Sequence, residues 1–104
     1  MSYTFTLDQR LGIYIPELIK DWDDYTLVEQ EQILAEWEAY RSDIPNRIKE
    51  IEKIIVSKLE ELNQEDNFIR SCALNSDIAE LASAINDLNI WFRIQQETEG
   101  RIHR

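Results

Sequence analysis

The sequence predicts an all-α fold, a small bundle of about four helices that includes a long antiparallel C-terminal helical hairpin. Glycine, the usual residue of tight turns, occurs only at Gly12 and Gly100, and proline only at Pro16 and Pro45. Helix formers such as Glu, Leu, Ile, Ala, Lys and Gln dominate the remainder, and apolar residues recur at helical spacing. These features are typical of helices joined by short connections.

A single domain over residues 1–104 is expected, with the ends frayed at about residues 1–6 and 99–104. The first helix is predicted at about residues 7–24, on the helical spacing of its larger apolar side chains. Pro16 predicts either a kink there or a fresh start in a first turn. Residues 3–7 alternate as a strand would, but a lone strand would have no partner.

The second helix is predicted to begin at a capping box formed by Thr26 and Glu29. Ser42 or Asp43 should end it and cap the third helix, with Pro45 in the following first turn. The third helix should run to about residue 62. Its expected buried stripe consists of Ile44, Ile48, Ile51, Ile55, Leu59 and Leu62.

The last helix carries the most regular apolar pattern in the chain. After an expected turn and cap at residues 65–67, its a/d seam consists of Leu74, Ile78, Leu81, Ile85, Leu88 and Phe92. This seam predicts self-association as a homodimer, although an intramolecular helical hairpin uses the same pattern. Residues 75–77 could break the helix near its start, and residues 98–100 are expected to end it. Cys72, beside Phe68 and Ile69, is interpreted as a small buried hydrophobe.

The charge distribution bears on the kind of partner. The net charge is −10, and residues 1–43, with ten acids and three bases, carry −7 of it. Such a field opposes binding to nucleic acid and to anionic membranes, and favours a basic partner or simply solubility. The single cysteine excludes an internal disulfide, and no signal peptide or membrane-spanning run is visible. A cytoplasmic protein is expected.

The sequence contains few of the residues that catalysis or metal binding would require. The chain has one histidine, His103, and one cysteine, too few for a zinc site, and it lacks a glycine-rich phosphate loop. A calcium loop beginning at Asp21 and Asp23 fails at later ligand positions. We therefore predict a protein that is not an enzyme and uses no cofactor or metal. An enzyme or ligand binder that relies on carboxylates remains a third alternative.

A repeated motif supplies the candidate partner site. Acid, tryptophan, acid, any residue, tyrosine occurs at residues 21–25 and again at 36–40. On a helix the two aromatics of each unit share a face, which predicts either a core stripe or an exposed aromatic patch among acids. The candidate partner-binding residues are Trp22, Tyr25, Trp37, Tyr40, Asp21, Asp23, Asp24, Glu36 and Glu38.

These observations predict a non-catalytic protein–protein interaction or regulatory module that self-associates. The alternative is an acidic neutralising protein, such as an immunity protein or a nucleic-acid mimic, that binds a basic partner. In either case the expected partner is a protein, not nucleic acid or a membrane.

Overall fold

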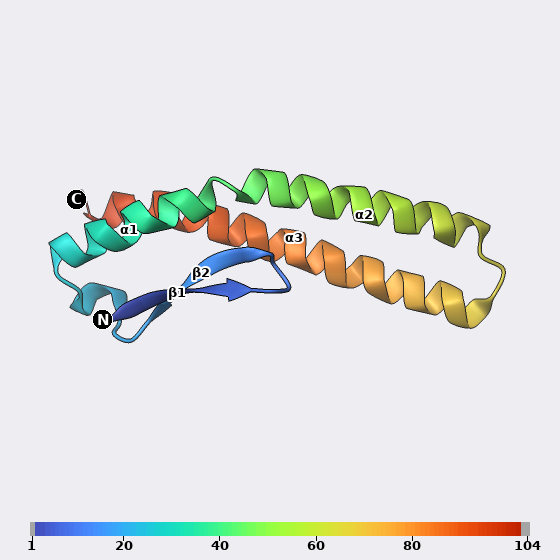
Figure 1. Cartoon of the computed structure of the whole chain (residues 1–104), viewed down its shortest axis with the longest axis horizontal. Coiled ribbons are helices and arrows are strands. Elements are labelled where there is room, and N and C mark those ends of the chain that lie inside the picture. Colours follow the sequence, from blue (N-terminus) through green and yellow to red (C-terminus); the bar gives the residue numbers. More distant parts are fainter. Residues whose placement is uncertain (1, 103–104) are drawn as a thin grey trace.

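The chain folds into an N-terminal β-hairpin, a short 3₁₀ turn and a helical region (Figure 1). The computed structural model describes residues 2–102, and side chains are described up to residue 94. The elements are β1 (Tyr3–Asp8), β2 (Ile13–Leu18), η1 (Trp22–Asp24), α1 (Leu27–Arg41), α2 (Ile44–Gln64) and α3 (Phe68–Ile102). The predicted all-α class and the bundle of about four helices are therefore wrong.

The correction concerns the predicted first helix, residues 7–24. In its place β1 and β2 form a two-stranded antiparallel sheet with the register Tyr3↔Leu18 through Asp8↔Ile13. The strand-like alternation at residues 3–7 therefore does have a partner, and it comes from the segment that had been assigned to a helix. Residues 3–6, expected to be frayed, belong to β1.

The turn between the strands explains why a hairpin forms here. The Asp8 carboxylate accepts a hydrogen bond from the Leu11 amide at 2.9 Å, and the Gly12 amide donates to the Asp8 carbonyl at 2.7 Å. Gly12 has a φ of +74°, a conformation that costs other residues free energy, and a Cβ there would collide with the Arg47 side chain. Pro16 lies in β2, an edge strand, where a missing N–H is tolerated.

The helical region follows the sequence more closely. The predicted capping box is confirmed: the Thr26 hydroxyl accepts from the Glu29 amide at 3.1 Å, and the Glu29 carboxylate accepts from the Thr26 amide at 3.0 Å. α2 begins at Ile44 with Pro45 in its first turn, as expected. Asp43 precedes α2 but makes no side-chain capping hydrogen bond.

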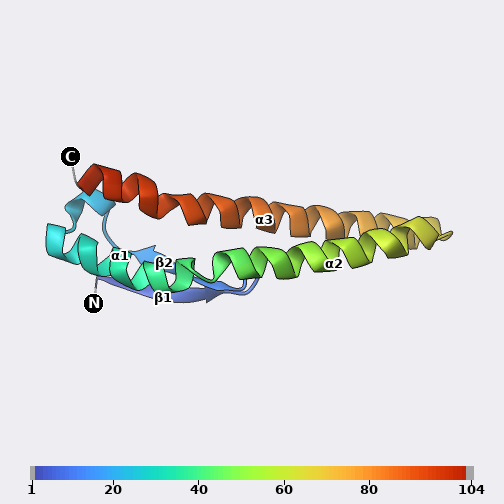
Figure 2. The same cartoon turned by 90° about the horizontal axis from the view of Figure 1, so that it is seen from above.

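α2 and α3 form a long antiparallel helical hairpin (Figure 2). Residues 65–67 connect them, and the Asn67 side chain caps α3 by accepting from the Arg70 amide at 2.9 Å. The predicted buried stripe of α2 is wrong at one position, because Leu59 is exposed and Lys58 is the half-buried residue. The Lys58 ammonium donates to Asp77 of α3 at 3.1 Å, so a salt bridge closes that level of the hairpin.

Several local expectations for the last helix are also corrected. α3 runs without a break through residues 75–77, where buried Leu74 and half-buried Ile78 on either side belong to its seam, and it continues past residues 98–100 to Ile102. Cys72 is exposed, and its neighbours Phe68 and Ile69 are each 80% exposed, so this cysteine is not a buried hydrophobe. The prediction that His103 lies in a frayed tail concerns a residue outside the described part of the chain.

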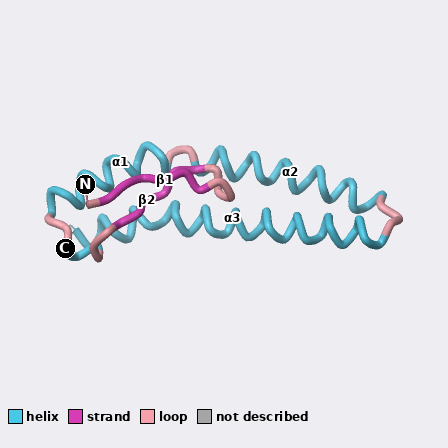
Figure 3. Tube along the Cα trace, turned by 60° about the horizontal axis from the view of Figure 1, so that its bottom comes forward, coloured by secondary structure: helices cyan, strands magenta, loops and turns pink. Residues whose placement is uncertain are grey.

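The molecule is elongated, with extents of 58 × 21 × 19 Å and a radius of gyration of 17.9 Å. A compact domain of this length would have a radius of gyration of about 13 Å. The β-hairpin lies across the gap between α1 and the C-terminal half of α3 (Figure 3). The main core is at that end and consists of Leu11, Ile13, Trp37, Ile44, Ile51, Ala84 and Leu88.

Candidate functional site

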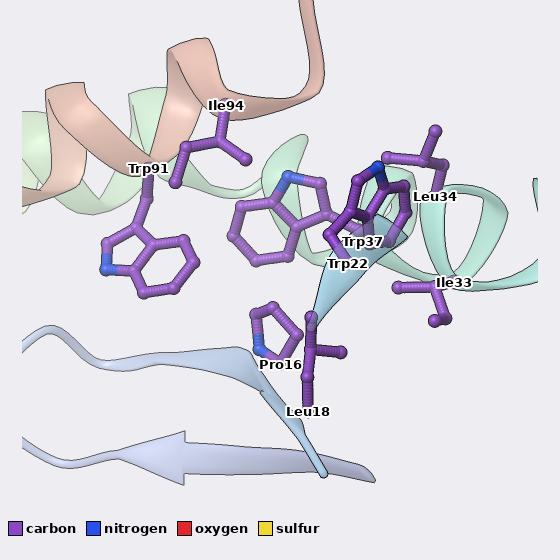
Figure 4. Close-up of a pocket in the computed structure, with 8 residues that line it drawn as sticks. All are labelled: Pro16, Leu18, Trp22, Ile33, Leu34, Trp37, Trp91 and Ile94. Atoms are coloured by element: carbon purple, nitrogen blue, oxygen red, sulfur yellow. The ribbon is translucent and has the colours of Figure 1, made fainter. Parts of the chain in front are cut away.

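An apolar pocket lies where the β-hairpin, the 3₁₀ turn and two helices meet. We call it the tryptophan pocket, since all three tryptophans of the chain line it (Figure 4). Its volume is about 280 Å³. The complete lining is Pro16, Leu18, Trp22, Ile33, Leu34, Trp37, Trp91 and Ile94.

Each wall follows from local structure. Pro16 and Leu18 are two residues apart on β2, so their side chains leave the same face of the sheet. On α1, Ile33 and Trp37 are one helical turn apart, and Leu34 is adjacent to them. The α3 wall likewise consists of residues three apart, 91 and 94. The pocket therefore exists only because four elements pack around it.

The three indoles differ in exposure. Trp37 is only 2% exposed, and its ring lies 5.7 Å from that of Trp91, centroid to centroid, at an interplanar angle of 58°. Trp91 therefore belongs to the same aromatic layer, and it is half-buried. Trp22 is half-buried as well, and η1 holds it at the rim, where its carbonyl accepts from the Gln30 side chain at 2.9 Å.

Trp37 has a further property that bears on binding. Its indole Nε1 is buried and has no hydrogen-bond acceptor among the described residues. A buried N–H without an acceptor costs about 1–3 kcal/mol. Because this N–H is itself buried, it is not offered to a ligand in the open space of the pocket, and the apolar part of the Trp37 ring forms the wall.

The repeated motif is divided by the fold, because its first unit lies on η1 and its second on α1. The two tryptophans reach the same pocket, but the two tyrosines do not. Tyr25 is 4% exposed and its hydroxyl bonds to backbone groups at the open end of the β-hairpin. Tyr40 is half-buried and lies 5.1 Å from both the Phe5 and Tyr14 rings. Both tyrosines therefore act in the fold.

The carboxylates of the motif lie on the surface. Asp21, Asp23 and Asp24 are exposed and flank Trp22 in the chain, so they stand beside the rim of the pocket. Glu36 and Glu38 are also exposed, on α1, and Glu38 pairs with Arg41 at 3.5 Å. The acidic residues that accompany the pocket are thus those of the first unit.

The predicted self-association seam is occupied within the chain. Leu74 and Leu88 are fully buried, and Phe92 is half-buried beneath the Arg41 guanidinium, 4.1 Å from the ring centroid. The other seam residues, Ile78, Leu81 and Ile85, are half-buried. The buried stripe of α2 takes the place of a second copy, so self-association remains a prediction that needs another surface.

The described residues include no cluster of three or more His, Cys, Asp or Glu side chains that could hold a metal ion. Among the described helices, none is both long enough and apolar enough to cross a membrane.

Of the residues that line the pocket, the candidate site predicted from the sequence contains only Trp22 and Trp37. It missed Pro16, Leu18, Ile33, Leu34, Trp91 and Ile94. The signal for β2 was the turn sequence from Asp8 to Gly12, which favours a hairpin once the alternating residues on both sides are read together. Comparison with protein families, with curated proteins and with solved structures finds no significant match.

Proposed function

We propose that this chain is a non-catalytic protein-interaction module that receives a side chain of a partner protein in the tryptophan pocket. One observation carries the proposal, namely the convergence of all three tryptophans on one apolar pocket beside exposed carboxylates. Tryptophan is enriched at the energetically dominant positions of protein interfaces, which favours this use. Pockets for small molecules and cofactors usually measure about 300–1,000 Å³. A volume of about 280 Å³ suits one anchoring side chain.

The charge supports a basic partner segment. Asp21, Asp23 and Asp24 stand at the rim beside Trp22, within the part of the chain that carries most of the net charge of −10. An arginine or lysine side chain can lay its aliphatic stem on the indoles and direct its cationic head to these carboxylates. The carboxylates would speed association, and the indoles would slow dissociation.

The test uses the full chain as bait in an extract of the native cells, followed by affinity measurement with the captured protein after purification. We expect Trp22→Ala to weaken binding roughly tenfold or more, as removal of an interface anchor does. Val28→Ala is the matched control, because Val28 is 64% exposed on α1 and does not line the pocket. A partner that binds the Trp22→Ala chain as tightly as the original chain would contradict the proposal.

The acidic neutralising protein is the alternative, and the three exposed aspartates in four residues favour it. For this alternative, ionic contacts with the aspartates would dominate the binding affinity, instead of contacts with the tryptophan pocket. In that case D21N/D24N should weaken binding more than Trp22→Ala, and the affinity should fall steeply with added salt. Weak salt dependence together with a large effect of Trp22→Ala would remove this alternative.

A further inference from the structure

β1 presents an unusual sheet edge. Within the described residues the sheet has only two strands, so the side of β1 that faces away from β2 pairs with no other strand. Proteins commonly protect such edges with proline or charge. β2 contains both, in Pro16 and Glu17, but residues 3–7 of β1 contain neither. Those residues, Tyr-Thr-Phe-Thr-Leu, are strongly strand-forming.

The space beside this strand is open. A groove of about 410 Å³ follows β1 where it passes α1. Its lining combines apolar and polar side chains, and consists of Tyr3, Thr4, Phe5, Glu36, Ala39 and Tyr40. Burial and the nearby Glu36 carboxylate raise the pKa of the Tyr3 phenol, so that side chain is neutral at physiological pH. An added strand would meet the neutral side chains of β1 on one side and the Glu36 carboxylate on the other, with Glu29 near the start of β1.

We propose that a second copy of this chain pairs with β1 through its own β1, antiparallel and centred on Phe5. This inference takes up the self-association that the sequence predicts, places it on another surface than the α3 seam, and is independent of the tryptophan pocket. A two-fold dimer needs a self-complementary surface. In this register Thr4 faces Thr6 of the other copy, and Tyr3 faces Leu7. Threonine–threonine and aromatic pairs are favourable across antiparallel strands. The product is one four-stranded sheet.

Charge explains why the second copy would use this surface. Each copy carries −10, so most faces of two copies repel each other. β1 is neutral from Tyr3 to Leu7, so no carboxylate stands on the paired strands between these residues. In the proposed register Asp8 faces Ser2, whose hydroxyl donates to the Glu29 carboxylate at 3.4 Å, so acidic side chains approach each other only toward the ends of the paired strands. A sheet edge also needs no apolar seam, which agrees with the burial of the α3 seam inside the chain.

The register allows a charge-swap test on exposed positions. Thr4 and Thr6 are both exposed, and both point to the face opposite Phe5. T4K/T6K places two lysines opposite each other twice per dimer, and it should raise the dimer dissociation constant roughly tenfold. T4K/T6E places lysine opposite glutamate in the same register, so it should dimerise at least as well as the original chain.

The measurement is light scattering on a sizing column over a range of concentrations, with circular dichroism to verify that every variant is folded. The expected result is a dimer that T4K/T6K dissociates and T4K/T6E retains. A full chain that is monomeric at several hundred micromolar, or a dimer that T4K/T6K leaves intact, would overturn the inference. Trp22→Ala should leave the dimer unchanged, so failure of the pocket proposal and failure of this one are separately visible.

Discussion

At the scale of single residues, one phenol closes the open end of the β-hairpin. The Tyr25 hydroxyl donates to the Ser2 carbonyl and accepts from the amides of Ile19 and Lys20 at 3.1 and 3.3 Å. The ring is buried, and the Lys20 ammonium lies 5.4 Å from its centroid. Because the same residue follows Trp22 by three positions, it also fixes where η1 and the rim of the tryptophan pocket stand.

Removal of the Tyr25 hydroxyl should lower the free energy of unfolding. Tyr25→Phe removes the hydroxyl's three bonds to the backbone. The Ile19 amide still donates to the Ser2 carbonyl at 3.2 Å, but the Lys20 amide loses the hydroxyl, so we expect a loss of about 1–3 kcal/mol in the free energy of unfolding. Denaturant unfolding followed by circular dichroism measures this loss. Tyr14→Phe is the matched control, because Tyr14 is 43% exposed on β2. Equal effects of the two substitutions would show that the hydroxyl of Tyr25 does not hold the hairpin.

At the scale of the elements, α1 begins at a capping box that ties its first turn to the end of η1. The Thr26 amide and hydroxyl both bond to Glu29, and these bonds hold the pKa of the Glu29 carboxyl below its ordinary value of 4.5. A lowered folded-state pKa means that the carboxylate stabilises the fold above pH 4.5 and that this contribution is lost as the pH falls through the folded-state pKa.

Thr26→Ala tests this cap by two measurements. It should raise the pKa of Glu29 only part of the way toward 4.5, because the amide of residue 26, the larger cause of the lowered pKa, still donates to the carboxylate; NMR titration of the side-chain carbonyl carbon measures this pKa. It should also lower the free energy of unfolding at neutral pH by about 1 kcal/mol. Most of this loss should persist at low pH, because the lost bond from the Glu29 amide to the Thr26 hydroxyl does not titrate; only the part due to the pKa change disappears as the pH falls through the folded-state pKa of Glu29. An unchanged stability at neutral pH would contradict this account of the cap.

The elements also differ in how far their local sequence predicted them. The start of α1 and the cap at Asn67 were predicted because capping groups act within a few residues of each other, and the start of α2 because proline is favoured in a first turn. β2 was not predicted, because its apolar residues also fit helical spacing. The deciding contact there is the pairing of Leu18 with Tyr3, fifteen residues earlier in the chain.

At the scale of the whole molecule, the elongated shape divides the chain into two regions with different support. At one end the β-hairpin, α1, the start of α2 and α3 surround the main core. Toward the 65–67 connection, α2 and α3 pack only against each other. Several large apolar residues in this region are exposed, including Val56, Leu59 and Phe68. The stability of that region therefore depends on the seam between the two helices.

Leu74→Ala probes this dependence. Leu74 is fully buried between α2 and α3, so the substitution should lower the free energy of unfolding by about 2–5 kcal/mol. Ile54→Ala, on the exposed side of α2, should cost much less, since Ile54 is 41% exposed. Light scattering on the same samples should show no change in oligomeric state with Leu74→Ala. If Leu74→Ala left the stability unchanged but abolished the dimer, Leu74 would instead belong to the interface between copies.

The sequence by itself determined the charge of the surface, the helical seam and the helix caps, because each arises from composition or from residues close together in the chain. The tertiary structure decided that residues 13–18 form a strand, that the α3 seam faces α2, and that the two units of the motif bring their tryptophans to one pocket while their tyrosines support the fold. These outcomes depend on contacts between distant segments, whose free energy outweighs the local preference of any one of them.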